Sequence, residues 1–76
     1  MVHESGRMKL HHLQYLVAVA ERGTVRGAAL ELGVSSTAVS RGLIELENLA
    51  GVPLLERKAE GVELTAGGQA LLSHAR

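Results

Sequence analysis

Residues 24–49 read TVRGAALELGVSSTAVSRGLIELENL, and this stretch contains two helical patterns joined by a short turn. Thr24, a typical N-cap residue, precedes the first pattern. Apolar residues then recur at i, i+3, i+4 and i+7, namely Val25, Ala28, Ala29 and Leu32. Gly33 ends this pattern, because glycine adopts the left-handed conformation at a helix C-terminus at little cost. Ser35 is the predicted N-cap of the second helix. Two helices joined by a glycine-containing turn predict a helix-turn-helix.

The outer face of the second helix is polar at its start. At 100° per residue, an apolar face of Val39, Leu43 and Leu46 lies opposite this polar face. Short hydroxyl side chains and an arginine allow close approach to the major groove and hydrogen bonds to base edges or phosphates. A solvated helix face is the simpler alternative, but the paired helices favour DNA contact. The predicted contacts on this helix are Ser36, Thr37, Ser40 and Arg41.

Composition limits the class of protein. Seventy-six residues make one small domain with a largely aliphatic core and a single aromatic residue, Tyr15. The absence of cysteine excludes disulfides and thiolate metal sites. The longest apolar run, 16–20, is too short to span a membrane, and no signal peptide is visible. We therefore expect a cytoplasmic protein without membrane contact.

The formal net charge of zero counts against nucleic-acid binding, since such domains are usually basic. Positive charge is nevertheless expected where DNA would lie, at Arg26, Arg41, Arg57 and Lys58. Acidic residues are expected to dilute this patch and to weaken non-specific binding by the isolated domain. They are Glu45, Glu47, Glu60 and Glu63.

The segments before the helix-turn-helix are simpler. Residues 1–8 are polar and aperiodic, and we expect a flexible tail. Apolar residues then predict a helix that ends near Arg22, with Gly23 as its stop signal. Two glycines interrupt helical patterns: Gly27 is expected to permit close packing, and Gly42 to leave a bare spot beside the polar face. The predicted apolar face of the first helix comprises Leu10, Leu13, Leu16, Val17 and Ala20.

Beyond the helix break at 51–53, the segments 54–58 and 62–64 read as strands joined by the glycine-containing turn 59–61. A hairpin after a helix-turn-helix is a wing, and Arg57 and Lys58 near its tip are candidates for backbone or minor-groove contacts. The alternative is a hairpin that only braces the core, with Arg57 paired to a glutamate.

Thr65 is the predicted N-cap of a last helix that continues to the end of the sequence. Its apolar residues Leu71, Leu72 and Ala75 need a partner surface. We expect a dimer contact through this helix, a chain cut from a longer protein, or both.

The order of these segments resembles the N-terminal DNA-binding domain of LysR-type transcriptional regulators over residues 8–76. The segments that carry the resemblance are LQYLVAVAERGTVRGAALELGVSSTAVSRGLIELE, GVPLLER and GVELTAGGQALLSHAR. The resemblance implies a mainly α fold, with a winged helix-turn-helix at 9–64 (a three-helix core plus a β-hairpin wing). The start of a linker helix at 65–76 would pair subunits into a dimer or tetramer.

The resemblance also implies residue roles. Ser36, Thr37, Ser40 and Arg41 match recognition-helix contacts, and Arg57 matches the wing arginine. Thr24 and Ser35 match helix starts that meet phosphates. The family often has Gln where Ser36 stands, so the base preference is expected to differ. A small-molecule inducer would act only through a C-terminal effector domain that is absent here, and no cofactor is expected in this domain.

Other functions are less well supported by the sequence. An enzyme is not expected, because there is no nucleophile–base pair at a recognisable spacing and no phosphate-binding glycine loop. The histidines are expected to be solvated rather than to bind a metal, since adjacent His11 and His12 point in different directions on a helix; His3 and His74 complete the set. The alternative function is a winged-helix protein-interaction or dimerisation module with little DNA binding, which Gly42 and the apolar Ile44 favour.

Overall fold

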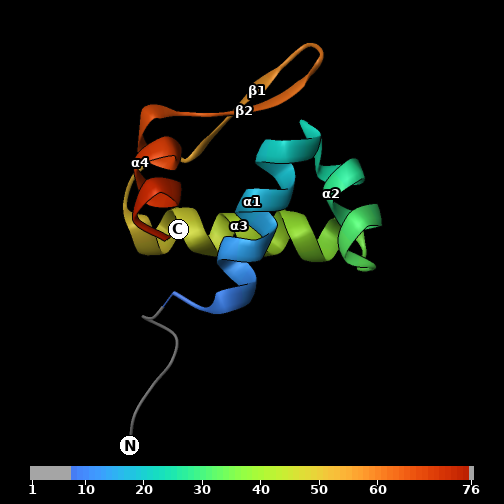
Figure 1. Cartoon of the computed structure of the whole chain (residues 1–76), viewed down its shortest axis with the longest axis horizontal. Coiled ribbons are helices and arrows are strands. Elements are labelled where there is room, and N and C mark those ends of the chain that lie inside the picture. Colours follow the sequence, from blue (N-terminus) through green and yellow to red (C-terminus); the bar gives the residue numbers. More distant parts are fainter. Residues whose placement is uncertain (1–7, 76) are drawn as a thin grey trace, which may run out of the picture.

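The computed structural model describes residues 8–75, with side chains up to residue 74. The predicted flexible tail, apart from Met8, therefore lies outside the described residues, as does His3. Within the described part, four helices and one two-stranded antiparallel sheet follow one another in a mainly helical fold (Figure 1). The elements are α1 Leu10–Arg22, α2 Val25–Leu32, α3 Ser36–Ala50, β1 Leu55–Lys58, β2 Gly61–Leu64 and α4 Ala66–Ala75.

The predicted helix-turn-helix is present as α2 and α3. The Thr24 and Ser35 hydroxyl oxygens accept hydrogen bonds from backbone N–H groups three residues on, at 2.9 and 3.0 Å, and so cap the two helices. Gly33 ends α2 with a φ of 71°, which a residue with a Cβ adopts only with strain. The sequence therefore predicted both the helices and the turn between them.

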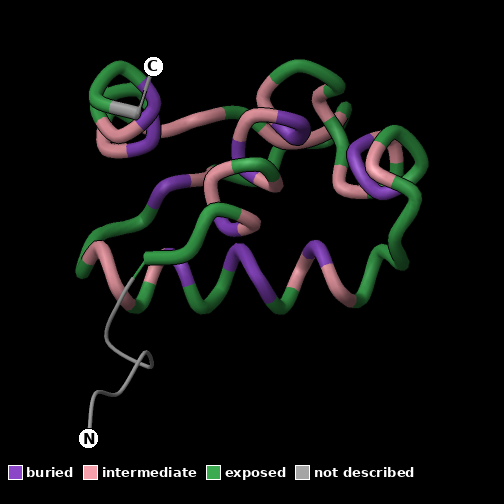
Figure 2. The backbone as a smooth tube through the Cα atoms, turned by 60° about the horizontal axis from the view of Figure 1, so that its bottom comes forward, coloured by how far each residue is buried: buried purple, intermediate pink, exposed green. Residues whose placement is uncertain are grey.

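The core lies between α1, α2 and the inner face of α3. Leu16, Val19, Val39 and Leu46 have exposed fractions of 0%, and Leu54 joins them from the segment before the wing. In Figure 2 the side of α3 that faces the other helices is buried, and the opposite side is exposed. The helical period alone was sufficient to identify this inner face.

The buried face of α1 differs from the expected one. Leu10 is 72% exposed, whereas His12, which was expected to be solvated, is 3% exposed. His12, Leu16 and Val19 are spaced at i, i+4 and i+7, so they share one face of the helix. The prediction failed because the apolar pattern could not indicate that a polar ring has hydrogen-bond partners inside the fold.

Gly42 is not the bare spot that the sequence suggested. It is buried, and a Cβ atom at this position would lie 2.5 Å from the ring of Tyr15. Tyr15 therefore packs directly on the backbone of α3, and glycine leaves the space for it. This contact brings α1 close to the helix whose outer face is polar.

The predicted wing is present, and polar contacts attach it. Leu55 lies opposite Leu64, and Lys58 lies opposite Gly61 in the antiparallel pair. The Val62 N–H donates to the Gly23 carbonyl at 2.8 Å, which fixes the hairpin to the turn between α1 and α2.

Thr65 caps α4 as predicted, because its hydroxyl oxygen accepts from the Gly68 N–H at 3.1 Å and the same hydroxyl donates to the Pro53 carbonyl at 2.7 Å. Leu72 is only 5% exposed and belongs to the core of its own chain, so it has little surface for the expected dimer contact. Leu71 is half-buried, and the side chain of Ala75 lies outside the described residues. Within the described part of the chain, the helices lack the length and apolar character needed to cross a membrane.

Candidate nucleic-acid interface

The predicted contact residues on α3 form one accessible surface. Ser36, Thr37 and Arg41 are exposed, and Ser40 is half-buried beside them. Ser35 ends the preceding turn and caps α3, so the short side chains of the first turn follow directly after the cap. We call these four residues, Ser36, Thr37, Ser40 and Arg41, the polar surface of α3.

Each helix of the pair begins with a capping hydroxyl. Thr24 and Ser35 are exposed, and each oxygen already accepts a backbone hydrogen bond. A hydroxyl that accepts one bond still has its own hydrogen to donate. Both side chains can therefore donate to an anionic oxygen while they cap their helices.

The three arginines that were predicted to contact DNA are exposed. Among residues 8–75, no carboxylate lies within ion-pair distance of Arg26, Arg41 or Arg57. The suggested pairing of Arg57 with a glutamate is thus not seen. Lys58 differs, because its amino group lies 3.9 Å from a Glu56 carboxylate oxygen and 3.8 Å from one of Glu63. These exposed pairs are weak, so Lys58 remains accessible but is partly compensated.

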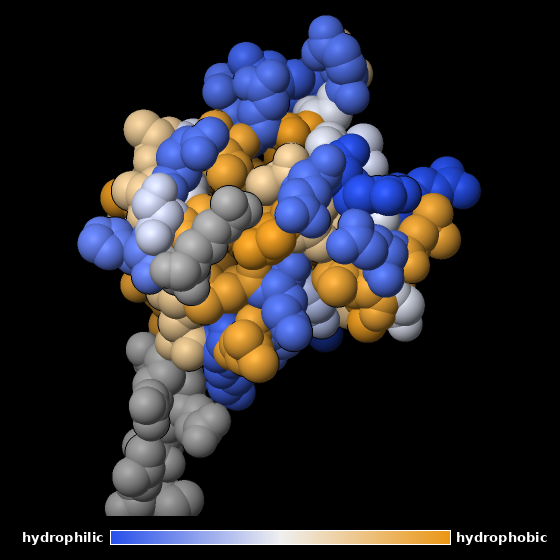
Figure 3. Space-filling model, in the orientation of Figure 1, coloured by the Kyte–Doolittle hydropathy of each residue, from blue (hydrophilic) through white to orange (hydrophobic). Residues whose placement is uncertain are grey.

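The wing arginine lies beside α3. Arg57 lines a hollow of about 80 Å³ together with Ser40 and Ile44, while hydrophilic side chains cover the end of the wing (Figure 3). The fold therefore brings Arg57 from β1 next to the polar surface of α3, although the two are separated in the sequence.

Two acids that were expected to dilute the positive charge have other partners. The Glu47 carboxylate accepts from the Leu54 and Leu55 N–H groups at 2.9 and 3.2 Å, and so holds the start of the wing. The Glu45 carboxylate accepts from His12 Nε2 at 3.0 Å, and this hydrogen bond lowers the Glu45 pKa. Sequence reasoning missed both roles, because the partners come from other elements.

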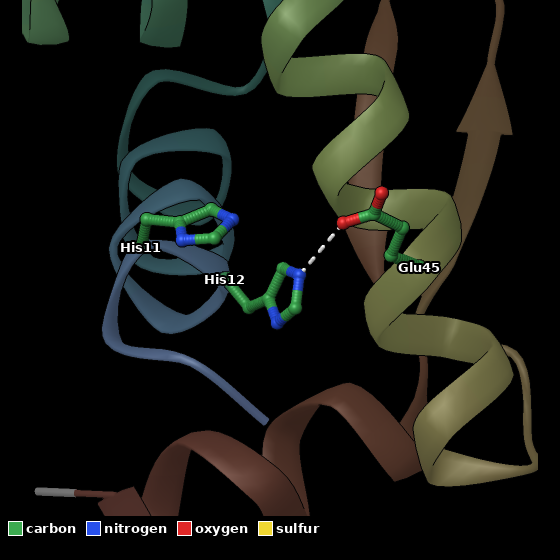
Figure 4. Close-up of side chains that lie close together, drawn as sticks. All are labelled: His11, His12 and Glu45. Atoms are coloured by element: carbon green, nitrogen blue, oxygen red, sulfur yellow. Dashed lines mark hydrogen bonds and ion pairs between the residues drawn. The ribbon is translucent and has the colours of Figure 1, made fainter. Parts of the chain in front are cut away.

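His11, His12 and Glu45 form the cluster that most resembles a cation site. One donor atom from each lies within 4.8 Å of the other two, so the adjacent histidines are closer together than their sequence spacing suggested (Figure 4). However, His12 Nδ1 accepts from the Lys9 backbone N–H at 3.1 Å. The neutral ring then carries its proton on Nε2 and donates it to Glu45, which leaves His12 with no free lone pair for a metal ion.

Comparison with known proteins identifies the family of this helix-turn-helix. The model for the bacterial regulatory helix-turn-helix protein, lysR family, matches residues 10–69. An uncharacterised HTH-type transcriptional regulator, YdcI of Escherichia coli K12, is 46% identical over 93% of this chain and 23% of its own length. The HTH-type transcriptional regulator TcbR of Pseudomonas sp. strain P51 is also 46% identical, over 91% of this chain and 24% of its own. The chain thus spans about a quarter of these regulators.

Solved structures share the fold. A complex of CbnR_DBD with DNA superposes with a TM-score of 0.86 and 46% identity, covering 91% of this chain and 79% of that one. A BenM_DBD complex with catB site 1 DNA gives a TM-score of 0.84 and 37% identity, covering 90% and 76%. The winged helix-turn-helix and the family model point to the same relatives, which are transcriptional regulators. The chain belongs to the LysR family of bacterial regulatory helix-turn-helix proteins.

Proposed function

We propose that this chain is a DNA-binding domain that recognises a specific double-stranded sequence as part of a LysR-type transcription regulator. The polar surface of α3 enters the major groove, and the wing with Arg57 and Lys58 contacts the adjacent backbone or minor groove. Arg26, Thr24 and Ser35 contact phosphates from the start of the helix pair.

One observation carries the proposal: an exposed Arg41, which makes no ion pair with any described residue, lies beside three small hydroxyl residues on a helix whose inner face is packed in the core. Short polar side chains beside one guanidinium group, which can donate two parallel hydrogen bonds, suit both phosphate contact and guanine recognition. The solved DNA complexes of CbnR_DBD and BenM_DBD, which have the same fold, support this arrangement.

The test is binding of the domain to duplex DNA, measured by fluorescence anisotropy at two salt concentrations. A random-sequence pool is used first, and the bound fraction is selected and sequenced. Arg41→Ala is expected to cost about 1–3 kcal/mol, and the remaining binding should have a smaller salt dependence. Arg22→Ala is the charge-matched control, since Arg22 is paired with Glu31 at 3.8 Å. Equal losses in both variants would refute the role of Arg41.

We further propose that two copies pair through α4 and its continuation. Two recognition helices related by a two-fold axis require a pseudo-palindromic site with half-sites about one turn apart, or a multiple of it. Leu71 and Ala75 are the proposed contacts, because Leu72 is used in the core. By analogy with the family, we propose that the assembly is a dimer or a tetramer. On the same basis, a small-molecule inducer acts through an effector domain elsewhere in the regulator.

The second candidate is a protein-interaction module, and one observation favours it. Ile44 lies on the outer side of α3 and is 59% exposed, where a purely electrostatic surface would not need an apolar side chain. Salt separates the two functions, because DNA affinity falls steeply with salt whereas an apolar contact through Ile44 changes little. Absence of binding at low salt, even with the domain linked as a dimer, would favour the interaction module.

A further inference from the structure

A carboxylate lies on the recognition helix one turn from its key arginine, yet the two do not pair. Glu45 follows Arg41 by four residues on α3, a spacing that brings opposite charges together on a helix. Among the described residues Arg41 has no ion-pair partner, and the Glu45 carboxylate accepts from His12 on α1 instead. The absence of the local pair therefore depends on where Glu45 is held.

The histidine that holds Glu45 is itself fixed. His12 is 3% exposed, and its Nδ1 accepts the Lys9 backbone N–H at the start of α1. The proton of the neutral ring must then be on Nε2, which points at Glu45 Oε1 (Figure 4). A buried ring with both nitrogens used has one orientation and one tautomer, so it is a rigid donor for a side chain on another helix.

Glu45 is held by one hydrogen bond and by nearby positive charge, with Lys9 and His11 adding to the effect of His12. Its side chain is 53% exposed, so burial does not restrict its rotamers. The hydrogen bond from His12 is the main reason that its pKa is lowered, and the carboxylate is therefore an anion at neutral pH. Without the hydrogen bond from His12, this anion is free to move toward Arg41 or toward the phosphates of a bound duplex, with Lys9 and His11 as the groups that still attract it toward α1.

We propose that His12 is a positioning residue for DNA binding, which holds the Glu45 carboxylate against α1 and away from Arg41 and the DNA. The proposal rests on the proposed function of α3. It gives a buried polar residue of α1 a role in keeping the recognition surface positively charged, although His12 itself does not touch the DNA.

The effect of losing this restraint is modest but measurable. An Arg–Glu pair at i, i+4 competes with DNA by about twofold in affinity for each recognition helix. In a dimer both helices contribute, so the loss is expected to be about fourfold for the assembly. Because the competing charge is Glu45, the loss must vanish when that charge is removed.

The experiment is a double-mutant cycle on DNA affinity, with the selected duplex as the probe. His12→Leu keeps an apolar volume but cannot donate to Glu45, and it is made with and without Glu45→Ala. The expected result is weaker binding with Glu45 present and no further change in the Glu45→Ala background. His12→Gln is the conservative control, since an amide can accept from Lys9 and donate to Glu45, and it should bind like the wild type. Circular dichroism confirms that each variant is folded.

Equal losses in both backgrounds would mean that His12 acts only through folding, and would overturn the proposal. No loss in either background would also overturn it. A second measurement does not need DNA: the Glu45 pKa is followed by NMR in an Arg41→Ala background, where it should rise when His12 is replaced by Leu. If the wild-type domain fails to bind DNA while this pKa responds, the proposed function fails but the histidine still restrains Glu45. If binding is normal and the pKa does not respond, only the positioning role fails.

Discussion

The helix-turn-helix and the wing both pack on the core, but in different proportions of apolar and polar contact: Leu55, Val62 and Leu64 of the wing are only partly buried against it. The helix-turn-helix is held by apolar side chains such as Leu16, Val39 and Leu46, which have exposed fractions of 0%. The wing is largely exposed, and its described attachments include hydrogen bonds from Leu54 and Leu55 to Glu47 and from Val62 to Gly23. Burial of apolar surface is non-directional, whereas hydrogen bonds require one geometry. In the wing, where burial is only partial, these hydrogen bonds therefore contribute a larger share of the attachment than they do in the helix-turn-helix.

The largest expected effect tests the apolar side of this comparison. Leu46→Ala removes a fully buried side chain of α3 and should lower the free energy of unfolding by about 2–5 kcal/mol. Urea denaturation followed by circular dichroism measures it. Ile44→Ala is the matched control on the same helix, and because Ile44 is 59% exposed its cost should stay within about 0.5 kcal/mol. Similar costs for both would contradict the assigned inner face.

A second prediction concerns the close contact between α1 and α3. Gly42→Ala adds a Cβ atom that would lie 2.5 Å from the Tyr15 ring. Overpacking should destabilise the fold by about 1–3 kcal/mol, although alanine is the better helix former by about 1 kcal/mol. Thermal unfolding measures the change. In a Tyr15→Leu background the same substitution should be neutral or stabilising, and a cost that persists there would rule out Tyr15 as its cause.

A third prediction tests the polar attachment of the wing. Glu47→Ala leaves two N–H groups without their acceptor, and because both bonds are only partly buried, water can replace part of what is lost and the expected total cost is about 1 kcal/mol. Hydrogen exchange should accelerate at Leu54 and Leu55 while the buried amides of α3 near Val39 stay protected. Glu63→Ala, on the exposed side of β2, is the control and should change neither the exchange at Leu54 and Leu55 nor that of the α3 amides. Uniform acceleration across the chain would show that Glu47 supports the whole fold and not the wing alone.

The smallest effect is a pH dependence. The hydrogen bond from His12 lowers the Glu45 pKa in the folded state below its ordinary value of 4.5. The unfolded chain therefore takes up the proton first as the pH falls. The stabilisation by Glu45 is complete above that ordinary value and disappears as the pH falls through the lowered one. The difference in melting temperature between wild type and Glu45→Gln should shrink below about pH 4, and a constant difference would exclude this linkage.

Most of the fold could be predicted because its signals are local. Caps at Thr24, Ser35 and Thr65, stops at Gly23, Gly33 and Gly51, and the helical period of α3 depend on residues within a few positions of one another. The exposed polar surface of α3 and the wing strands followed from the same patterns. These features require no knowledge of which distant segments meet.

The errors have a common cause. His12 and Gly42 were assigned to solvent and to a bare surface, and each lies instead against another element of the same chain. Glu45 and Glu47 were interpreted as surface charge, although Glu45 accepts a hydrogen bond from α1 and Glu47 accepts two from the segment that leads into the wing. Residue type and periodicity do not indicate the identity of a long-range partner.

The sequence by itself thus determined the order and ends of the helices, the wing and the polar surface of α3, because hydrogen bonding and side-chain period act within a few residues. Only the tertiary structure decided that Arg57 lies beside Ser40, that Tyr15 packs on Gly42 and that His12 holds Glu45. Those contacts join residues far apart in the chain. Their geometry is fixed when the apolar faces pack together, and the charges of the recognition surface are positioned only then.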